Sequence, residues 1–322
     1  METKLFFNNG RSALKAGLKI LNLKEKDEVL VPEFICDSVI QPFKDLNIIP
    51  IFFKVKDNLN PYWKDVSKKF NQNTKAIMMI HFFGFPNEIE KFYKFKKNNK
   101  IYLIEDYCHG NGGKYKNFFL GNLGDISFSS IKKIIPIVKS GGILKINLKA
   151  INSNYKFINN LKKVNIYNFI NELFLRLKII RKFYFKIFRY EIFRKKYEAY
   201  DSIEYAKKTK FFIGDNMSLN IIKKFNFDKE KKRRFNSYKK LEKIFNKKNI
   251  KPFFKINKDI LPWYYVGKTK LGIVGRKKLF KWCWKNNIDC FSWPKFPKAI
   301  ENRAQNKKNW NSIVCVSLKE NQ

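Results

Sequence analysis

The chain has 322 residues, 44% of them hydrophobic and 17% aromatic, which suits a large domain plus a smaller one and excludes a disordered basic tail. Its 68 Lys and Arg against 27 Asp and Glu give a net charge of +41, yet no zinc-finger spacing, ribonucleoprotein motif or basic zipper accompanies them. No secretory signal opens the sequence, and no apolar run approaches the roughly 20 residues of a membrane-spanning helix. We therefore expect a cytoplasmic globular protein.

The basic excess is concentrated in the second half of the chain. Residues 1–150 carry 25 basic and 14 acidic side chains, whereas residues 151–322 carry 43 and 13. Most of the excess is lysine, and it accompanies abundant Asn, Ile and Phe, residues that an AT-rich coding sequence over-uses. Compositional drift and an anionic partner both explain such a surface, because net charge governs non-specific binding and defines no site.

The five cysteines are scattered and odd in number, which does not fit a disulfide framework. None stands at a zinc spacing from a histidine, and the gap between Cys283 and Cys290 is too wide for a metal knuckle. The sequence therefore predicts a reduced protein without a metal site.

Residues 1–150 alternate between helical and strand patterns. In chain order we predict a helix over 10–23, a strand at 28–33, a helix near 36–46, strands at 48–55 and 75–83, a helix around 87–98, and strands at 101–106, 125–130 and 142–147. Apolar strands separated by helices indicate an α/β fold, a three-layer large domain with a mostly parallel sheet covered on both faces. In such sheets the ligand lies beyond the carboxyl ends of the strands.

The rest of the chain divides into two segments. Residues 151–210 read as a helical basic connecting segment, in which a helix over 169–197 has an apolar stripe opposite its Lys and Arg side chains. The pattern fits a helix lying on an anionic membrane surface, and it fits a helix at a dimer interface with its lysines in water. Residues 211–322 alternate helices with short strands and predict a smaller α+β C-terminal domain.

Two segments near the predicted strand and helix ends carry residues suited to chemistry. In "IEDYCHG", Glu105 and Asp106 end a buried strand and His109 follows, so that a carboxylate is ready to pair with a cationic ring nitrogen. In "NNGRSAL", a glycine and small polar residues open a helix, where backbone N–H groups favour a phosphate. The same letters fit an ordinary helix N-cap by Asn9 or Ser12.

The stretch "SFSSIKKIIPIVKSGG" contains a third candidate group. A lysine that forms a Schiff base must be a neutral amine, which a desolvated setting or a neighbouring positive charge favours. Lys133 precedes an apolar stretch, Lys132 supplies the neighbouring charge, and Ser129 and Ser130 are suitably placed to donate hydrogen bonds to a phosphate. Two solvated lysines fit the same letters.

Taken in order, these segments resemble the DegT/DnrJ-type family of pyridoxal-phosphate-dependent sugar aminotransferases, which have the aspartate-aminotransferase fold (fold type I). Over residues 8–150, "NGRSALKAGLKILNLKEKDEVLVPEF" is similar to the family's "SGTxAL…GxGDEVIVPxF", "TKAIMMIHFFGFP" to "TKAIxxVHxxGxP", and "IEDYCHGNGGKYKN" to "IEDAAQAHGAxYKG". The family's Schiff-base lysine stands eight and nine residues before a Gly-Gly pair. Lys133 has this spacing to Gly141 and Gly142, and Lys132 does not.

The resemblance implies a role for each matching residue. Residues 1–150 would form the domain that binds pyridoxal 5'-phosphate, with Lys133 as its covalent attachment and Asp106 on the pyridine nitrogen. His109 falls where the family usually has a glutamine near the ring oxygen, and Cys36 where many members place an aromatic over the ring. The phosphate would be bound by Gly10, Arg11 and Ser12, joined by Ser130 or Ser129.

Two hypotheses on function follow. The first is an aminotransferase that converts a nucleotide-linked keto-sugar, with glutamate as amino donor, in surface-polysaccharide or glycan synthesis; the fold implies a homodimer, and no specific nucleic acid is expected. The alternative is a cofactor-free relative that binds a membrane or nucleic acid through its basic half. It is motivated by the charge of residues 151–322, by an end that stops short of the family's final helix, and by "GDNMS" around Asn216, where the family reads "GYNYRM".

Overall fold

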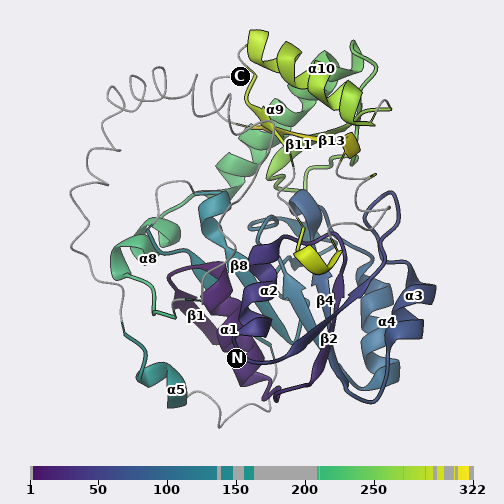
Figure 1. Cartoon of the computed structure of the whole chain (residues 1–322). Helices are drawn as coiled ribbons and strands as arrows, with labels where there is room; N and C mark the ends of the chain where they lie inside the picture. The colour runs from purple at the N-terminus through teal and green to yellow at the C-terminus, as the bar shows by residue number, and fades with distance from the viewer. Residues whose placement is uncertain are drawn as a thin grey trace.

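A computed structural model describes residues 3–135, 139–147, 156–162, 209, 211–270, 272–286, 288–292, 296–300, 308 and 311–318 (Figure 1). Its large sheet has seven strands in the order β1-β9-β8-β5-β4-β2-β3. They are β1 (Thr3–Phe7), β2 (Glu28–Pro32), β3 (Ile49–Phe53), β4 (Thr74–Ile80), β5 (Tyr102–Asp106), β8 (Ile126–Ser130) and β9 (Gly142–Ile146). The five strands from β3 to β8 pair in parallel, and β9 and β1 add antiparallel pairing at one edge.

Helices and single turns connect these strands. They are α1 (Gly10–Ile20), α2 (Asp37–Lys44), α3 (Trp63–Lys69), α4 (Ile89–Asn99), and the 3-10 turns η1 (Phe82–Gly84) and η2 (Ile131–Lys133). Helix α1 begins at a cap in which the Asn9 side chain accepts a hydrogen bond from the Ser12 N–H. Its buried face contacts β8 and β9, and Gly17 lies so close to Ile126 that a Cβ there would be 2.5 Å from the Ile126 side chain. A side chain at Gly17 would have to displace the ends of the Ile126 and Leu144 side chains for α1 to keep this distance from the sheet.

The second half of the chain forms a smaller antiparallel sheet with its own helices. Its strand order is β10-β11-β13-β12, with β10 (Lys251–Pro252), β11 (Tyr264–Lys268), β12 (Cys290–Phe291) and β13 (Ile313–Ser317). The remaining described elements are α5 (Lys156–Asn159), α8 (Asn216–Lys223), α9 (Phe227–Asn246), α10 (Gly272–Lys285), η4 (Lys298–Ile300) and the hairpin β6 (Lys114–Tyr115) and β7 (Phe118–Phe119). Figure 1 shows α9 and α10 beside the small sheet, at the opposite end of the molecule from α5.

Aromatic contacts join the two sheets at the carboxyl ends of the parallel strands. Phe85, just beyond β4, stacks on Phe254 with ring centroids 4.5 Å apart, and Phe34, just beyond β2, meets Phe296 edge to face at 5.3 Å. Side chains from both sheets belong to one continuous buried core. The small sheet is thereby fixed over the strand ends, where an α/β sheet places its ligand.

The architecture confirms the predicted fold class, an α/β chain with a large, mostly parallel sheet and a smaller sheet. Every helix and strand predicted within residues 1–150 is present, with ends shifted by a few residues. Four helices and strands of this region were not predicted: β1, α3, β6 and β7, all of seven residues or fewer. The predicted basic helix over 169–197 lies outside the described residues. Among those that are described, no helix is both long and apolar enough to cross a bilayer.

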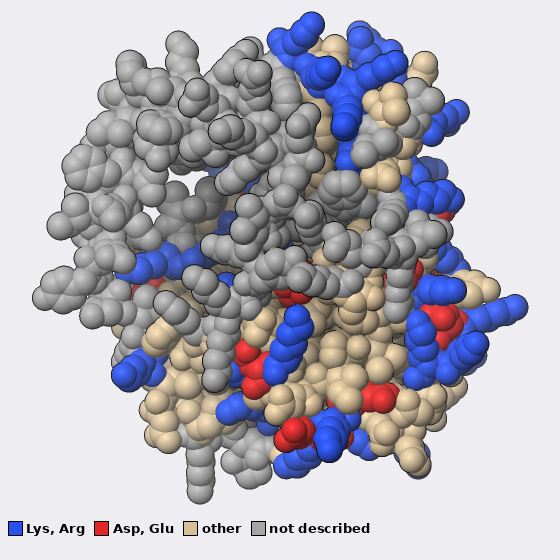
Figure 2. All heavy atoms as spheres, in the orientation of Figure 1, with Lys and Arg blue, Asp and Glu red and all other residues tan. Residues whose placement is uncertain are grey.

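The surface charge follows the division seen in the sequence. On the face shown in Figure 2, basic side chains gather over the upper part, where α10 lies, and are mixed with acidic ones over the large sheet. Exposed ion pairs such as Lys116–Glu90 at 2.8 Å contribute little to stability, because solvent screens them.

Candidate active site

The parallel strands β5 and β8 deliver the central residues of the candidate site. Asp106 ends β5 and pairs in register with Phe128 of β8, while β8 leads directly into η2, which ends at Lys133. His109 lies three residues beyond the end of β5. Because β5 and β8 are neighbours, their carboxyl ends bring Asp106, His109 and Lys133 into one place.

Lys133 lies between a histidine and an indole ring. Its Nζ is 2.6 Å from His109 Nε2 and 4.3 Å from the centre of the Trp263 ring. The rings of His109 and Trp263 stack, with centroids 4.1 Å apart and planes 25° from parallel. Trp263 directly precedes β11, so the second half of the chain completes the surroundings of the lysine.

The turn η1 after β4 holds Trp263 and His109 in place. The backbone N–H of Trp263 donates a 2.8 Å hydrogen bond to the backbone carbonyl of Phe83. Gly84 has φ +97°, and a Cβ there would lie 2.6 and 2.8 Å from two backbone carbonyl oxygens, those of Leu261 and His109. Only glycine permits this approach, which gives "HFFGFP" a physical role at the site.

His109 is buried, and both of its ring nitrogens are engaged. Its Nδ1 accepts a 3.1 Å hydrogen bond from the N–H of Phe83, a residue held at φ +58°. Burial, followed by the positive charge of Lys133, lowers the pKa of His109 well below its usual value. The ring is therefore a neutral imidazole at physiological pH.

Asp106 is a buried carboxylate, 5% exposed, with unusual electrostatics. Its Oδ1 accepts a 2.9 Å hydrogen bond from the Cys108 N–H. Burial raises the pKa of Asp106, and the charge of Lys133 and the bond from Cys108 offset this only in part. A carboxylate in this state gains from a further cationic partner, which a protonated pyridine nitrogen would supply.

The start of α1 lies against the end of β8, with no room for side chains between them. A Cβ on Gly10 would be 3.2 Å from the Ser129 carbonyl and 3.3 Å from Ser130 Cβ. A Cβ on Gly142 would be 2.0 Å from the carbonyl oxygen of Asn9. The second glycine after the lysine is thus required for β9 to pass the start of α1. The end of β8 therefore lies beside the N-terminus of α1, whose backbone N–H groups suit a phosphate.

The other residues predicted to bind the phosphate divide into two groups. The Ser12 N–H donates to Asn9 Oδ1 at 3.0 Å and its hydroxyl approaches the same oxygen at 3.3 Å, so Ser12 belongs to the helix cap, while Arg11 is half-buried beside it. The Ser129 hydroxyl donates to Asn111 Oδ1 at 2.6 Å. Of the two serines ending β8, Ser130 is the one whose Cβ faces Gly10.

Cys36 occupies the N-cap position of α2 and is half-buried, with Sγ 3.1 Å from Ser38 Oγ. Burial and then the charge of Asp106 raise the pKa of Cys108, and Cys36 contributes to the same shift. Cys36 therefore interacts electrostatically with the loop that follows Asp106.

The "GDNMS" segment around Asn216 anchors the loop after Lys133. Asp215 caps α8 by accepting from the Ser218 N–H at 2.7 Å. The Ser218 hydroxyl accepts hydrogen bonds from the N–H groups of Lys139 and Ser140, at 2.9 and 3.0 Å. The segment thus has an architectural role in this chain: it fixes the residues directly before the Gly-Gly pair.

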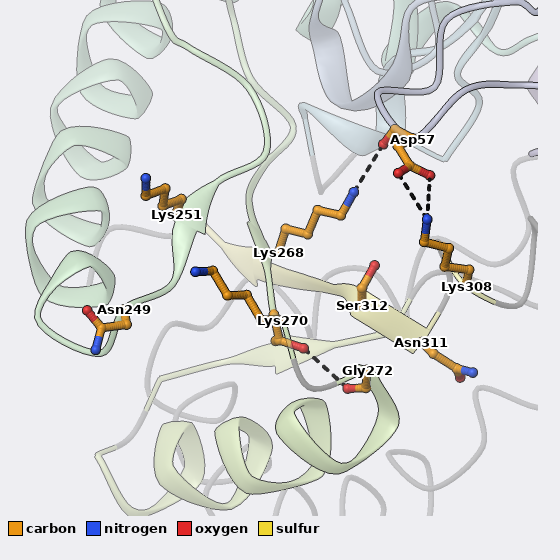
Figure 3. A pocket seen from close by; sticks show the side chains of 10 residues that line it. Asp57, Asn249, Lys251, Lys268, Lys270, Gly272, Lys308, Asn311 and Ser312 are labelled. Atoms are coloured by element: carbon orange, nitrogen blue, oxygen red, sulfur yellow. Dashed lines mark hydrogen bonds and ion pairs between the residues drawn. The ribbon is translucent and has the colours of Figure 1, made fainter.

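A separate hollow of about 520 Å³ lies on the small sheet (Figure 3). It contains none of the residues described above, and its lining combines four lysines with one carboxylate, Asp57. Lys308 Nζ pairs with Asp57 Oδ2 at 3.1 Å and Lys268 Nζ reaches the Asp57 carbonyl at 3.4 Å. The lysines are Lys251, Lys268, Lys270 and Lys308.

Comparison with known proteins identifies the family. The sequence matches the DegT/DnrJ/EryC1/StrS aminotransferase family over residues 2–167, slightly more than half of the chain. The protein belongs to this family. The GDP-perosamine synthase of Escherichia coli O157:H7 is 33% identical over 149 residues, which are 45% of this chain and 40% of that relative. The dTDP-4-dehydro-2,3,6-trideoxy-D-glucose 4-aminotransferase of Saccharopolyspora spinosa is 27% identical over 146 residues, 44% of this chain and 37% of that relative. The matched stretch thus spans about two fifths of each relative.

Solved structures share the fold over almost the whole chain. Helicobacter pylori PseC, an aminotransferase involved in pseudoaminic acid biosynthesis, superposes with a TM-score of 0.69 at 15% identity, covering 98% of this chain and 81% of PseC. Spr1654 from Streptococcus pneumoniae, known in PLP, PMP and apo forms, gives TM-scores of 0.69 to 0.70 at 13 to 14% identity. This likeness confirms the predicted fold, that of type I pyridoxal-phosphate aminotransferases.

Proposed function

We propose that the protein is a pyridoxal-phosphate-dependent aminotransferase that acts on a nucleotide-linked keto-sugar. The observation that carries this proposal is the placement of Lys133 and Asp106 beyond the ends of two adjacent parallel strands, where the charge of the lysine opposes the burial that raises the pKa of the carboxylate. An amine and a carboxylate so arranged are the two groups that the cofactor requires of its protein.

The residues present fit the cofactor at each of its ends. Lys133 would hold it covalently, Asp106 would pair with its ring nitrogen, and the N-terminus of α1, beside Ser130, would bind its phosphate. When bound, pyridoxal phosphate supplies an electron sink for the carbanion that forms at the substrate carbon. Cys36 and His109 would lie beside the ring.

Lys133 would also act as the proton-transfer group. Once an amino donor has displaced it from its covalent bond, Nζ would take a proton at the reacting carbon and return it to the neighbouring one. Asp106 would stay ionised because a cation beside it offsets the cost of its burial. Trp263 and His109 would restrict the motion of the lysine.

The substrate, the amino donor and the assembly are part of the proposal. The relatives named above carry names that refer to GDP- and dTDP-linked sugars, which supports a nucleotide-linked keto-sugar and a role in surface-polysaccharide or glycan synthesis. Glutamate is the proposed amino donor, and a homodimer the proposed assembly.

Adding pyridoxal phosphate to the purified chain tests the proposal. We expect a yellow protein whose visible band disappears on addition of glutamate and which aminates a nucleotide-linked keto-sugar. Lys133→Ala should abolish the band and turnover, whereas Lys132→Ala, the matched control one residue away, should keep both. A Lys133→Ala protein with a band that borohydride bleaches would refute the assignment of the lysine.

A second candidate is anion binding by the basic surface without a cofactor. The lysine-lined hollow on the small sheet favours it, because four lysines line it together with a single carboxylate, that of Asp57, and two of them, Lys251 and Lys270, point away from Asp57 (Figure 3). A chain that stays colourless with pyridoxal phosphate but binds anionic lipid vesicles in a salt-sensitive way would support this second function.

A further inference from the structure

The hollow on the small sheet is concave, polar and mostly positive. Its volume of about 520 Å³ lies within the range of sites that bind small molecules, roughly 300–1,000 Å³. Among the described residues, four lysines and a single carboxylate, that of Asp57, give its lining a formal excess of three positive charges. Hydroxyl and amide groups, which can donate hydrogen bonds to an oxyanion, complete the lining. They belong to Asn249, Thr269, Asn311 and Ser312.

Asp57 divides the four lysines into two pairs (Figure 3). Lys308 Nζ pairs with its carboxylate at 3.1 Å, and Lys268 Nζ reaches its backbone carbonyl at 3.4 Å. Lys251 and Lys270 point away from Asp57, and no acidic side chain among the described residues pairs with either of them. One half of the hollow is therefore positive without a counter-charge from the part of the chain that the structure describes.

The register of the small sheet makes this arrangement unfavourable without a ligand. Lys251 on β10 and Lys268 on β11 are directly opposite each other in the antiparallel pairing, so both side chains leave the sheet on the same face. Like charges in directly opposite positions are destabilising. An anion bound between them would remove this repulsion, whereas water and salt only screen it.

We propose that the hollow is a binding site for a soluble ligand with two linked phosphates, separate from the catalytic site. A terminal phosphate carries roughly −1.5 to −2 charges at pH 7, and a second, linked one brings the total close to the positive excess of the lining. Lysine ammonium groups bind phosphate oxygens as point charges. Gly272, the first residue of α10, also lines the hollow, and the positive end of a helix favours an anion.

The hollow is well removed from the lysine of the active site. Trp263, which contacts Lys133, directly precedes β11, and Lys268 is the last of the five residues of that strand. At about 3.3 Å per residue, Trp263 and Lys268 are separated by roughly 16 Å. The lining contains neither Trp263 nor His109. This site would therefore exist whether or not the protein is an aminotransferase.

Binding of inorganic pyrophosphate to the full chain, measured by titration calorimetry, tests the proposal. The hollow variant, Lys251→Gln/Lys270→Gln, removes the two lysines that point away from Asp57. Lys277→Gln/Lys278→Gln is the matched control, because both lysines are exposed on α10 and neither lines the hollow. We expect wild type and control to bind pyrophosphate alike, and the hollow variant about 10-fold or more weakly, since it loses two charged hydrogen-bond donors.

Asp57→Asn should change the affinity in the opposite direction. It removes the carboxylate that competes for Lys308, so pyrophosphate should bind several-fold more tightly. Without ligand, the hollow variant should be at least as stable in urea as wild type, because the repulsion between Lys251 and Lys268 is gone. Lysines with only a structural role would make it less stable. Equal pyrophosphate affinities in wild type, hollow variant and Asp57→Asn would indicate an adventitious ion only and would overturn the proposal.

Vesicles of phosphatidylcholine and phosphatidic acid distinguish a soluble ligand from a lipid headgroup. The hollow and control variants should co-sediment with them equally, because each has lost two surface charges. Weaker vesicle binding by the hollow variant, with its pyrophosphate affinity unchanged, would contradict a soluble ligand. A chain that stays colourless with pyridoxal phosphate but gives the expected pyrophosphate affinities would refute the proposed function and leave this site standing.

Discussion

Glu105 and Asp106 are neighbours on β5, yet their carboxylates lie in opposite environments. Glu105 receives five hydrogen bonds, from His81 Nε2, from the N–H groups of Gly121, Leu123 and Gly124, and from the Ser127 hydroxyl. Asp106 receives one backbone hydrogen bond, from Cys108, and the charge of Lys133. One acidic pair in the sequence thus has a structural member and a chemical one.

The number of donors explains why the two pKa values shift in opposite directions. Burial works to raise the pKa of Glu105, but the hydrogen bonds and the His81 contact outweigh it and the pKa is lowered. Burial prevails at Asp106, whose pKa is raised. The Glu105 carboxylate, with its full set of hydrogen bonds, holds the loop after β7 in place. The Asp106 carboxylate has fewer hydrogen bonds, and a cation beside it would stabilise its charge.

The largest effect that separates the two carboxylates should come from Asp106→Asn. The variant removes the charge proposed to pair with the ring nitrogen, so turnover should fall by about 10²- to 10³-fold or more, while the free energy of unfolding changes little. Steady-state kinetics together with urea unfolding would measure both. Full activity in Asp106→Asn would contradict the proposal that the Asp106 carboxylate takes part in the reaction.

Glu105→Gln should show the reverse pattern. An amide cannot accept from all five donors, and the loss should lower the free energy of unfolding by roughly 3 kcal/mol. Molecules that remain folded should retain the visible band with pyridoxal phosphate. Unchanged stability in urea unfolding would contradict the structural role assigned to Glu105.

The turn that carries Trp263 to the lysine should tolerate no Cβ at Gly84. Gly84→Ala adds an atom within 3 Å of two carbonyl oxygens at φ +97°, so we expect a loss of about 1–3 kcal/mol in the free energy of unfolding. Gly113→Ala is the matched control, because its Cβ would lie 3.2 Å or more from its neighbours. An equal loss in both variants would show that the close approach at η1 has no special cost.

The two serines at the end of β8 should differ as the two carboxylates do: one affects cofactor binding and the other affects stability. Ser130→Ala should weaken pyridoxal phosphate binding by several-fold, about the 1 kcal/mol of one hydrogen bond, and leave stability unchanged. Ser129→Ala should lower stability by a similar amount, because Asn111 loses a buried partner, and leave cofactor affinity intact. Titration by absorbance would measure the affinities, and interchanged results would reverse our assignment.

The smallest expected difference between Glu105 and Asp106 is in how each changes the free energy of unfolding with pH. The stabilisation from Glu105 is fully present above its unfolded value near 4.5 and is lost as the pH falls through its lowered folded pKa. For Asp106 the folded chain binds the proton more tightly, so stability falls as the pH rises from 3.8 through the raised folded pKa. Replacing Glu105 by Gln should therefore flatten the acid limb of stability against pH, and replacing Asp106 by Asn should steepen it.

The sequence contained enough to predict the large sheet and the meeting of Asp106 with Lys133. Continuous apolar strands between helices imply parallel pairing, and parallel pairing places the residues that follow β5 and β8 side by side. The spacing of Gly141 and Gly142 from the lysine was evident too, but not its cause, the approach of the β9 backbone to Asn9.

Residues that reach the site through tertiary contacts were not predictable. Trp263 lies 130 residues beyond Lys133 in the sequence, and tertiary contacts such as the hydrogen bond to the Phe83 carbonyl and the stacking on His109 place it there. No local pattern distinguishes it from the other five tryptophans of the chain. The choice between Ser129 and Ser130 likewise depended on a tertiary contact, the hydrogen bond of Ser129 to Asn111 in the loop after β5.

The most direct test of the central claim is to locate the cofactor among the many lysines. The chain would be mixed with pyridoxal phosphate, reduced with borohydride, digested and mapped by mass spectrometry. We predict one modified residue, Lys133, at stoichiometric occupancy, and its loss in Lys133→Ala. Modification spread over surface lysines, or confined to a different one, would contradict the account.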